Sequence, residues 1–248
     1  MILFHDTASI ISLYSILEST LKSATSLGIL GTGGEDPDFI YFTPASDDFI
    51  FNYPQETLVF DFETMLNTYK HFFINSSNAY GPIDGTMGNE KNCECRKTFY
   101  SESLLQTGKN KLNHLVGTPC LVNSLEEMRD YILSIPQNQK AYINSRYKCE
   151  GGPEVGFYEN NISLLGCLRS VRIRSVDFFK SNHYYSTEIP AKLNMSIDEM
   201  YDKILKKIND LGAEVIIVGV EKKGGKKSKT LKRPKSSKRS KRSKRFKK

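Results

Sequence analysis

The sequence of 248 residues has no tryptophan, five cysteines and no apolar run of the roughly 18 residues that a membrane-spanning helix requires. We therefore expect no membrane association. The first ten residues, MILFHDTASI, lack the basic region and the cleavage pattern of a signal peptide. The cysteines are odd in number and mostly isolated, which favours reduced thiols over a disulfide framework. These absences predict an intracellular protein that is not secreted.

Motifs for metal and nucleotide binding are scarce as well. Cys93 and Cys95 are separated by one residue and lack a second pair at zinc-site spacing, so we expect no metal. The G-x-S-x-G elbow of many hydrolases is missing. The glycine-rich stretch 31–34 (GTGG) lacks the Lys-Ser/Thr pair of a P-loop and predicts a flexible loop instead. Zinc proteins, serine hydrolases and P-loop NTPases therefore find no support.

Charge is divided unevenly along the chain, although the formal net charge is +7. Of the 35 Lys and Arg residues, 16 lie between Lys222 and Lys248, where no acidic residue occurs, so 19 remain beside all 28 acidic residues. The body thus carries −9 and the tail +16. We predict one globular domain over residues 1–221 and a disordered tail over 222–248, because the tail has too few apolar residues to fold.

The Lys/Arg/Ser-rich tail predicts binding to DNA or RNA through phosphate contacts, or a nuclear-import signal. It lacks interleaved aromatic residues for stacking on bases, so we expect no sequence-specific recognition. Its composition is similar to that of tails on proteins of large DNA viruses. The expected location is therefore nuclear, nucleic-acid-associated or in a virion.

Hydrophobic patterning in the body mixes short apolar runs with helical stripes, which predicts an α+β fold. Helical spacing or capping boxes occur over Ile10–Leu21, Leu125–Ile135 and Ile197–Leu211. Extended segments are expected at Met1–Phe4, Phe39–Thr43, Thr57–Phe62, Ala141–Asn144, Glu154–Tyr158, Ser163–Ile173 and Glu214–Val220. Residues from about 75 to 119 lack such patterning and predict a long loop insertion over the sheet.

Three short motifs follow one another in a fixed order. They are residues 3–7 (LFHDT) before an amphipathic helix, 39–43 (FIYFT) after the glycine-rich loop, and 152–157 (GPEVGF). In this order the sequence resembles the ADP-ribosyltransferase fold of poly-ADP-ribose polymerases, nucleic-acid ADP-ribosyltransferases and RNA 2′-phosphotransferases. The resemblance covers roughly 1–62 and 142–173. It implies a split β-sheet core with flanking helices.

The resemblance also implies NAD as a substrate and a role for each motif residue. His5 would bond a ribose hydroxyl of NAD, and Thr7 would support His5 from the same turn. Tyr41 would stack on the nicotinamide, and Glu154 would hold the ribose and stabilise the positive charge that develops as the glycosidic bond breaks. Asp6 stands where many relatives have Gly, and Gly152 where arginine-specific transferases have Glu or Gln. The acceptor, protein or nucleic acid, therefore stays open.

Two alternatives remain beside this hypothesis. Each motif residue taken singly is more often structural, so the chain could be a non-catalytic nucleic-acid-associated or virion structural protein that keeps the fold without the chemistry. The second alternative is a metal-dependent nuclease. Asp61 and Glu63 alternate along a predicted strand and would face the same side, a spacing that some metal nucleases use. Further acids in a convincing context are missing, which makes this the weaker alternative.

Overall fold

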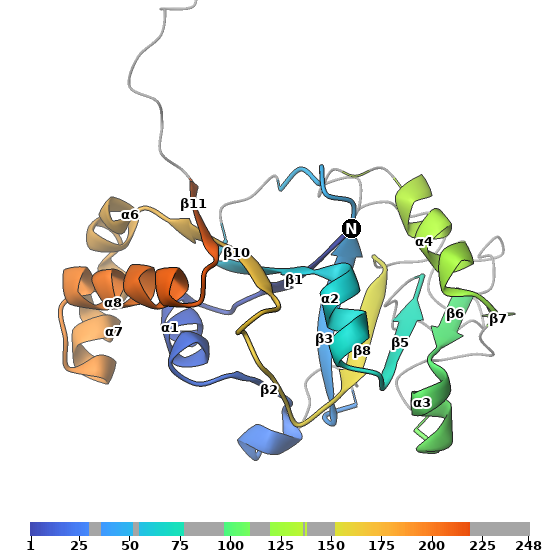
Figure 1. Ribbon diagram of the computed structural model, residues 1–248. Coiled ribbons are helices and arrows are strands. Elements are labelled where there is room, and N and C mark those ends of the chain that lie inside the picture. The colour runs from blue at the N-terminus through green and yellow to red at the C-terminus, as the bar shows by residue number, and fades with distance from the viewer. Residues whose placement is uncertain are drawn as a thin grey trace, which may run out of the picture.

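The structure, a computed structural model, describes residues 1–29, 36–51, 55–76, 97–109, 120–135, 137 and 152–218 (Figure 1). Its strands are β1 (Ile2–Asp6), β2 (Leu21–Lys22), β3 (Phe39–Ala45), β4 (Thr57–Asp61), β5 (Phe72–Asn75), β6 (Lys97–Tyr100), β7 (Cys120–Leu121), β8 (Glu154–Tyr158), β9 (Asn161–Ile162), β10 (Leu168–Arg174) and β11 (Glu214–Val218). Its helices are α1 (Ile10–Glu18), η1 (Thr25–Leu27), α2 (Phe62–Thr68), α3 (Glu102–Gln106), α4 (Leu125–Ser134), α6 (Val176–Ser181), α7 (His183–Leu193) and α8 (Ile197–Asp210).

Nine strands form one sheet in the order β11-β10-β4-β1-β3-β8-β5-β6-β7, and β2 and β9 form a separate pair. The two edge pairs, β10 with β11 and β6 with β7, are parallel, whereas the pairs between them are antiparallel. Helices α6, α7 and α8 gather at the β10–β11 end of the molecule, and α3 and α4 lie at the other end (Figure 1). The predicted α+β class is confirmed.

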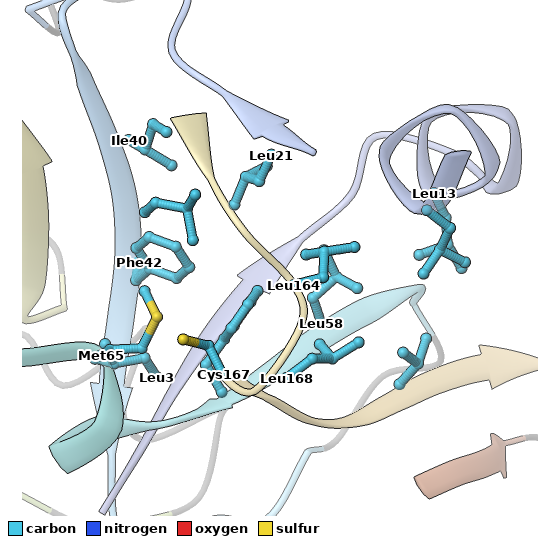
Figure 2. Packing of buried hydrophobic residues seen from close by; sticks show 14 of the residues in the cluster. Leu3, Leu13, Leu21, Ile40, Phe42, Leu58, Met65, Leu164, Cys167 and Leu168 are labelled. Carbon is cyan, nitrogen blue, oxygen red and sulfur yellow. The ribbon is translucent and has the colours of Figure 1, made fainter. Parts of the chain in front are cut away.

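Both faces of the sheet are covered by apolar side chains. The larger cluster includes Leu3, Phe42 and Leu58 from three neighbouring strands together with residues of α1, α2 and α8. Figure 2 shows part of this layer, with Met65 of α2 and Cys167 packed beside the strands. The opposite face carries two smaller clusters, one around Phe4 and Phe49, and one around Phe39 and Phe73. Burial on both sides explains why the central strands read as nearly unbroken apolar runs.

The capping signals placed two helices correctly. The Ser124 hydroxyl accepts a hydrogen bond from the Glu127 N–H at the start of α4, and the Ser196 hydroxyl accepts one from the Glu199 N–H at the start of α8. The apolar stripe of α8 is buried in the larger core cluster. The helix ends before Gly212, whose φ of +71° is one that glycine adopts without strain.

Several predicted boundaries were wrong for local reasons. The strand predicted to reach Phe62 ends at Asp61, whose carboxylate accepts a hydrogen bond from the Thr64 N–H and caps α2. The first helix ends at Glu18 because Leu21 joins β2, which pairs with β9. The predicted strand Ser163–Ile173 is confirmed only in its last part, because β10 begins at Leu168.

Other segments were missed or lie outside the described residues. Helices α6 and α7 were not predicted, and the segment 75–119, predicted as a loop, contains β6 and α3 in its described part. The predicted strand Ala141–Asn144, the glycine-rich stretch 31–34 and the tail 222–248 lie outside the described residues. The strand predicted over Glu214–Val220 is described as far as Val218.

Two cysteines test the expectation of reduced thiols. Cys167 is free and buried, and burial raises the pKa of its thiol, so the group stays protonated at neutral pH. Cys120 is disulfide-bonded, so the expectation was wrong for this residue.

Within the part of the chain that the structure describes, no helix has the length and apolar character needed to cross a membrane.

Candidate functional site

The sheet opens between β1 and β3, two of its central strands. They pair only over Ile2–Phe4 and Thr43–Ala45. Beyond Phe4, β1 continues to pair with β4 on its other side, and the residues of β3 before Thr43 pair with β8. The central sheet is therefore split into two halves joined by three residue pairs. This is the split core that the resemblance predicted, and it places the ends of the first two motifs on opposite sides of the opening.

His5 is the first residue of β1 beyond the last pair with β3, and its side chain spans the opening. Its Nδ1 lies 2.9 Å from the carbonyl oxygen of Tyr41. Because a carbonyl can only accept, Nδ1–H must be the donor, which leaves Nε2 as an acceptor in the neutral ring. Burial lowers the pKa of His5 below its ordinary value of 6.5 and outweighs the opposing effects of the Tyr41 carbonyl and Asp6. The half-buried ring is thus neutral at physiological pH.

Tyr41 and Glu154 project from the same face of the sheet. In the register of β3 with β8, Tyr41 lies opposite Gly156, and Glu154 is two residues away from Gly156 along β8. Side chains two residues apart on a strand share a face, and so do directly paired residues. The Tyr41 ring is half-buried and its hydroxyl donates to the Asp36 carbonyl at 3.1 Å, whereas the Glu154 side chain is buried, with the residue 4% exposed.

Gly156 makes room for an aromatic ring beside these two residues. A Cβ at this position would lie 2.2 Å from Cε1 of Phe73, the residue opposite on β5. The Phe73 ring in turn lies 6.2 Å from the Tyr41 ring between centroids. The glycine in the third motif therefore permits the close approach of Phe73, which packs against Tyr41 and limits where its ring can go.

The three predicted residues are thus on three consecutive strands, but not all on one face. His5 pairs with Leu58 and faces the larger core, where its ring centroid lies 5.6 Å from that of Phe42. The structure brings His5 to the backbone of Tyr41, and brings the side chains of Tyr41 and Glu154 to one face. The sequence could not have shown this difference, because it depends on the register across the opening.

Thr7 holds the turn that follows His5. Its hydroxyl donates to the carbonyl oxygens of Glu56 at 3.1 Å and of Ser9 at 3.3 Å, and its N–H donates to the same Glu56 carbonyl at 2.9 Å. The residue is 2% exposed. Thr7 therefore fixes the turn between β1 and α1, with its hydroxyl bonded to backbone carbonyls, and its support of His5 stays a prediction.

Sequence reasoning missed an ion pair behind this turn. Arg174 on β10 makes a two-pronged contact with Glu56, with both N–O distances at 2.6 Å. Glu56 is 1% exposed, and the Arg174 guanidinium lies over the ring of Phe178 at 4.2 Å. The Tyr185 hydroxyl also contacts the guanidinium at 3.2 Å. Since 118 residues separate the two charges, no local spacing signals the pair.

The arrangement proposed for a metal-dependent nuclease is not found. Asp61 and Glu63 do not alternate on a strand, because Asp61 caps α2 and Glu63 lies in its first turn. The Glu63 carboxylate pairs with Arg129 at 2.6 Å. Among the described residues there is no group of three or more His, Cys, Asp or Glu side chains placed to hold a metal ion. The prediction that these two acids face the same side was therefore wrong.

An open hollow of about 660 Å³ lies elsewhere, between α2 and the β6–β7 edge of the sheet. Its lining includes Lys70, Phe99, Tyr100, Leu121 and Arg129. None of the four residues predicted to bind NAD lines it. The hollow and the split between β1 and β3 are separate places on the molecule.

The neutral state of His5 predicts a pH dependence of stability. The folded protein holds His5 below its ordinary pKa of 6.5, so the unfolded chain takes up the proton first as the pH falls. The free energy of unfolding should therefore be undiminished above pH 6.5 and fall below it, until His5 is protonated in the folded state too. Urea titrations across this range should show a smaller fall for His5→Gln than for the wild type.

The exposed His183 supplies the control for this measurement. His183→Gln should keep the full wild-type pH dependence. An equal pH dependence in His5→Gln and wild type would show that the His5 ring titrates as it does in an unfolded chain, contrary to its burial.

No protein-family model and no curated protein matches the chain. Among solved structures, the chain is similar to Thermus sp. 2.9 DarT in complex with carba-NAD+, with a TM-score of 0.39 and 10% sequence identity. The match covers 87% of this chain and 94% of that chain.

Proposed function

We propose that the protein binds NAD in the opening between β1 and β3 and transfers its ADP-ribose to an acceptor. One observation carries the proposal: the His5 side chain bridges the two halves of a split sheet, with Tyr41 on the facing strand and buried Glu154 on the next one. A split sheet exposes backbone and side chains at its centre, where an uninterrupted sheet would have only paired strands. His5 reaches the Tyr41 backbone across this opening, and the side chains of Tyr41 and Glu154 share one face beside it.

Glu154 would supply the electrostatic part of the reaction. When the bond between ribose C1′ and the nicotinamide nitrogen breaks, its electron pair goes to the nicotinamide ring and positive charge builds on the ribose. A fixed carboxylate beside that carbon favours the charge, and a buried one does so more strongly because little water screens it. An acceptor hydroxyl, amine or ring nitrogen then bonds to C1′, and a nucleophile that carries a proton gives it up.

His5 and Tyr41 would position the substrate. Because His5 donates through Nδ1 to the Tyr41 carbonyl, its Nε2 is left to accept a hydrogen bond from a ribose hydroxyl. The Tyr41 ring, held from one side by Phe73, offers a flat surface for the nicotinamide. Both roles follow the resemblance seen in the sequence, and both use groups that the fold has already fixed.

The protein can be tested for this function directly. The full-length chain is incubated with labelled NAD and with protein, DNA and RNA acceptors, and nicotinamide release, label transfer and the NAD-dependent shift in Tm are measured. We expect a rise in Tm and release of nicotinamide, with transfer to at least one acceptor class. If none of the three signals appears, the fold is kept here without the chemistry, as in the non-catalytic alternative.

The tail would bring the domain to nucleic acid, in the nucleus or wherever DNA or RNA is exposed. Its 16 positive charges attract phosphates, whereas the body carries −9 and offers no such platform by itself. Deleting residues 222–248 should abolish the retention of the protein on DNA and RNA that falls as salt rises. A variant with the tail serines changed to alanine keeps the charge and should bind as the wild type does. Unchanged retention after the deletion would place binding on the body.

A further inference from the structure

Arg172 differs from the other arginines that the structure describes. Arg129, Arg169 and Arg174 each form an ion pair with a carboxylate, contributed by Glu63, Asp47 and Glu56 respectively. Within the described residues, Arg172 has no carboxylate within ion-pair distance. Burial lowers its pKa, and the neighbouring Asp6 opposes this effect without forming an ion pair with it. Arg172 is thus a partly buried positive charge that forms no ion pair with any carboxylate in the part of the chain that the structure describes.

The Arg172 side chain is held in place on one face of the sheet. Arg172 on β10 lies opposite Thr57 on β4, and Thr57 lies opposite Asp6 on β1. The Thr57 hydroxyl donates to the Asp6 carboxylate at 2.6 Å. The centre of the Arg172 guanidinium lies 4.2 Å from the centroid of the Phe51 ring, so one flat side is covered by an aromatic ring. Its N–H donors lie in the plane of the group, and no hydrogen bond to another described residue occupies them.

This face is the one that carries Tyr41 and Glu154. Arg172 pairs with Thr57 on β4, and Thr57 pairs with Asp6 on β1. Phe4, two residues before Asp6, pairs with Thr43 on β3, and Tyr41 lies two residues before Thr43. Paired residues and residues two apart on a strand share a face, so Arg172 and Tyr41 lie on the same one. Arg172 also stands level with Asp6, beyond the last β1–β3 pair, where the sheet is open. Four strand intervals of about 4.8 Å separate β8 from β10, which gives a width of at least about 19 Å. A ligand that reaches from Glu154 to Arg172 must be extended.

We propose that Arg172 binds a phosphate group in the ADP-ribose part of the nucleotide, at the far end from Glu154. This inference rests on the proposed function, and it names the part of the substrate that Arg172 recognises. Arginine suits the role because its planar donors match the oxygens of a phosphate, and charge-assisted hydrogen bonds are the strong ones. The Asp6 carboxylate, which accepts a hydrogen bond from the Thr57 hydroxyl, lies on the same face and would repel a phosphate, so Arg172 alone would supply the attraction there.

The test is a calorimetric comparison of the full-length wild type with Arg172→Ala, Arg172→Lys and Arg169→Ala, titrated with ADP-ribose, inorganic diphosphate and nicotinamide. Arg169 is the matched control, because it lies on the same strand but is exposed and paired with Asp47. We expect Arg172→Ala to weaken ADP-ribose binding by about 10- to 100-fold, the range that a lost charge-assisted hydrogen bond gives. Arg172→Lys should recover part of the loss. Nicotinamide binding should stay unchanged in all variants.

The outcomes separate this inference from the proposed function. If wild type binds and cleaves NAD but Arg172→Ala binds ADP-ribose as tightly as Arg169→Ala does, the inference is wrong and the proposed function stands. If ADP-ribose and diphosphate bind through Arg172 but NAD is never cleaved, the inference holds and the transferase activity is wrong. If the wild type binds neither ADP-ribose nor diphosphate, the inference is overturned.

Discussion

Glu154→Gln should lower the rate of nicotinamide release from NAD by about 100- to 1,000-fold, while the protein stays folded. The substitution keeps the size of the side chain and its capacity to hydrogen-bond on β8, but removes the negative charge that would face the ribose as the glycosidic bond breaks. Glu154 is 4% exposed, so water does not take over the role of the lost charge. Steady-state rates at saturating NAD measure the effect.

Glu159 provides the control for this loss. It follows β8 directly, and its carboxylate lies 3.5 Å from Nδ1 of His71, outside the split. Glu159→Gln should leave the rate within about twofold of wild type, as expected for a residue that does not act on the transition state. If Glu154→Gln releases nicotinamide as fast as Glu159→Gln does, Glu154 takes no part in the reaction.

Arg174→Met should lower the free energy of unfolding by about 3–5 kcal/mol, the largest effect on stability that we expect from one substitution. The change leaves the Glu56 carboxylate, which is 1% exposed, without the two-pronged contact that compensates its charge. The loss should reach the site as well, because the Glu56 carbonyl accepts both the N–H and the hydroxyl of Thr7. Urea denaturation gives the free energy, and the rate of NAD turnover reports on the turn.

A double variant and an exposed ion pair are the controls for this measurement. Replacing both charges, Glu56→Met with Arg174→Met, should be less destabilising than Arg174→Met alone, because no charge is then left buried. Lys192→Ala, which breaks an exposed pair with Glu188 on α7, should change the free energy of unfolding far less than Arg174→Met does. If Arg174→Met is no more destabilising than Lys192→Ala, the buried pair of Glu56 and Arg174 does not stabilise the fold as proposed.

Much of the sheet could be predicted from the sequence, whereas helices α2, α6 and α7 could not. Strands such as β3, β4 and β8 could be found because burial on two faces produces short apolar runs with turn residues at their ends. Helix α2 was hidden because Asp61 reads equally well as the last residue of a strand and as a helix cap. Helices α6 and α7 carry weak apolar stripes, and the described parts of 75–119 are short elements near a sheet edge, which local patterns do not reveal.

The candidate site was predictable only in its residue types and their order. His5, Tyr41 and Glu154 stand on consecutive strands, but the sequence does not contain the register that turns His5 toward the Tyr41 backbone and Tyr41 and Glu154 toward one face. Contacts between distant residues were equally out of reach. The pair of Glu56 with Arg174 and the alignment of Arg172 with Asp6 arise from strand pairing, which brings together residues with no common local pattern.

The most direct test of the central claim is a crystal structure of the protein with a non-hydrolysable NAD analogue. We predict that the analogue lies in the opening between β1 and β3, with its nicotinamide against the Tyr41 ring and its nicotinamide ribose beside Glu154 and His5. An analogue bound instead in the hollow between α2 and the β6–β7 edge, or a protein that takes up none at saturating concentration, would contradict the claim that the split sheet is an NAD site.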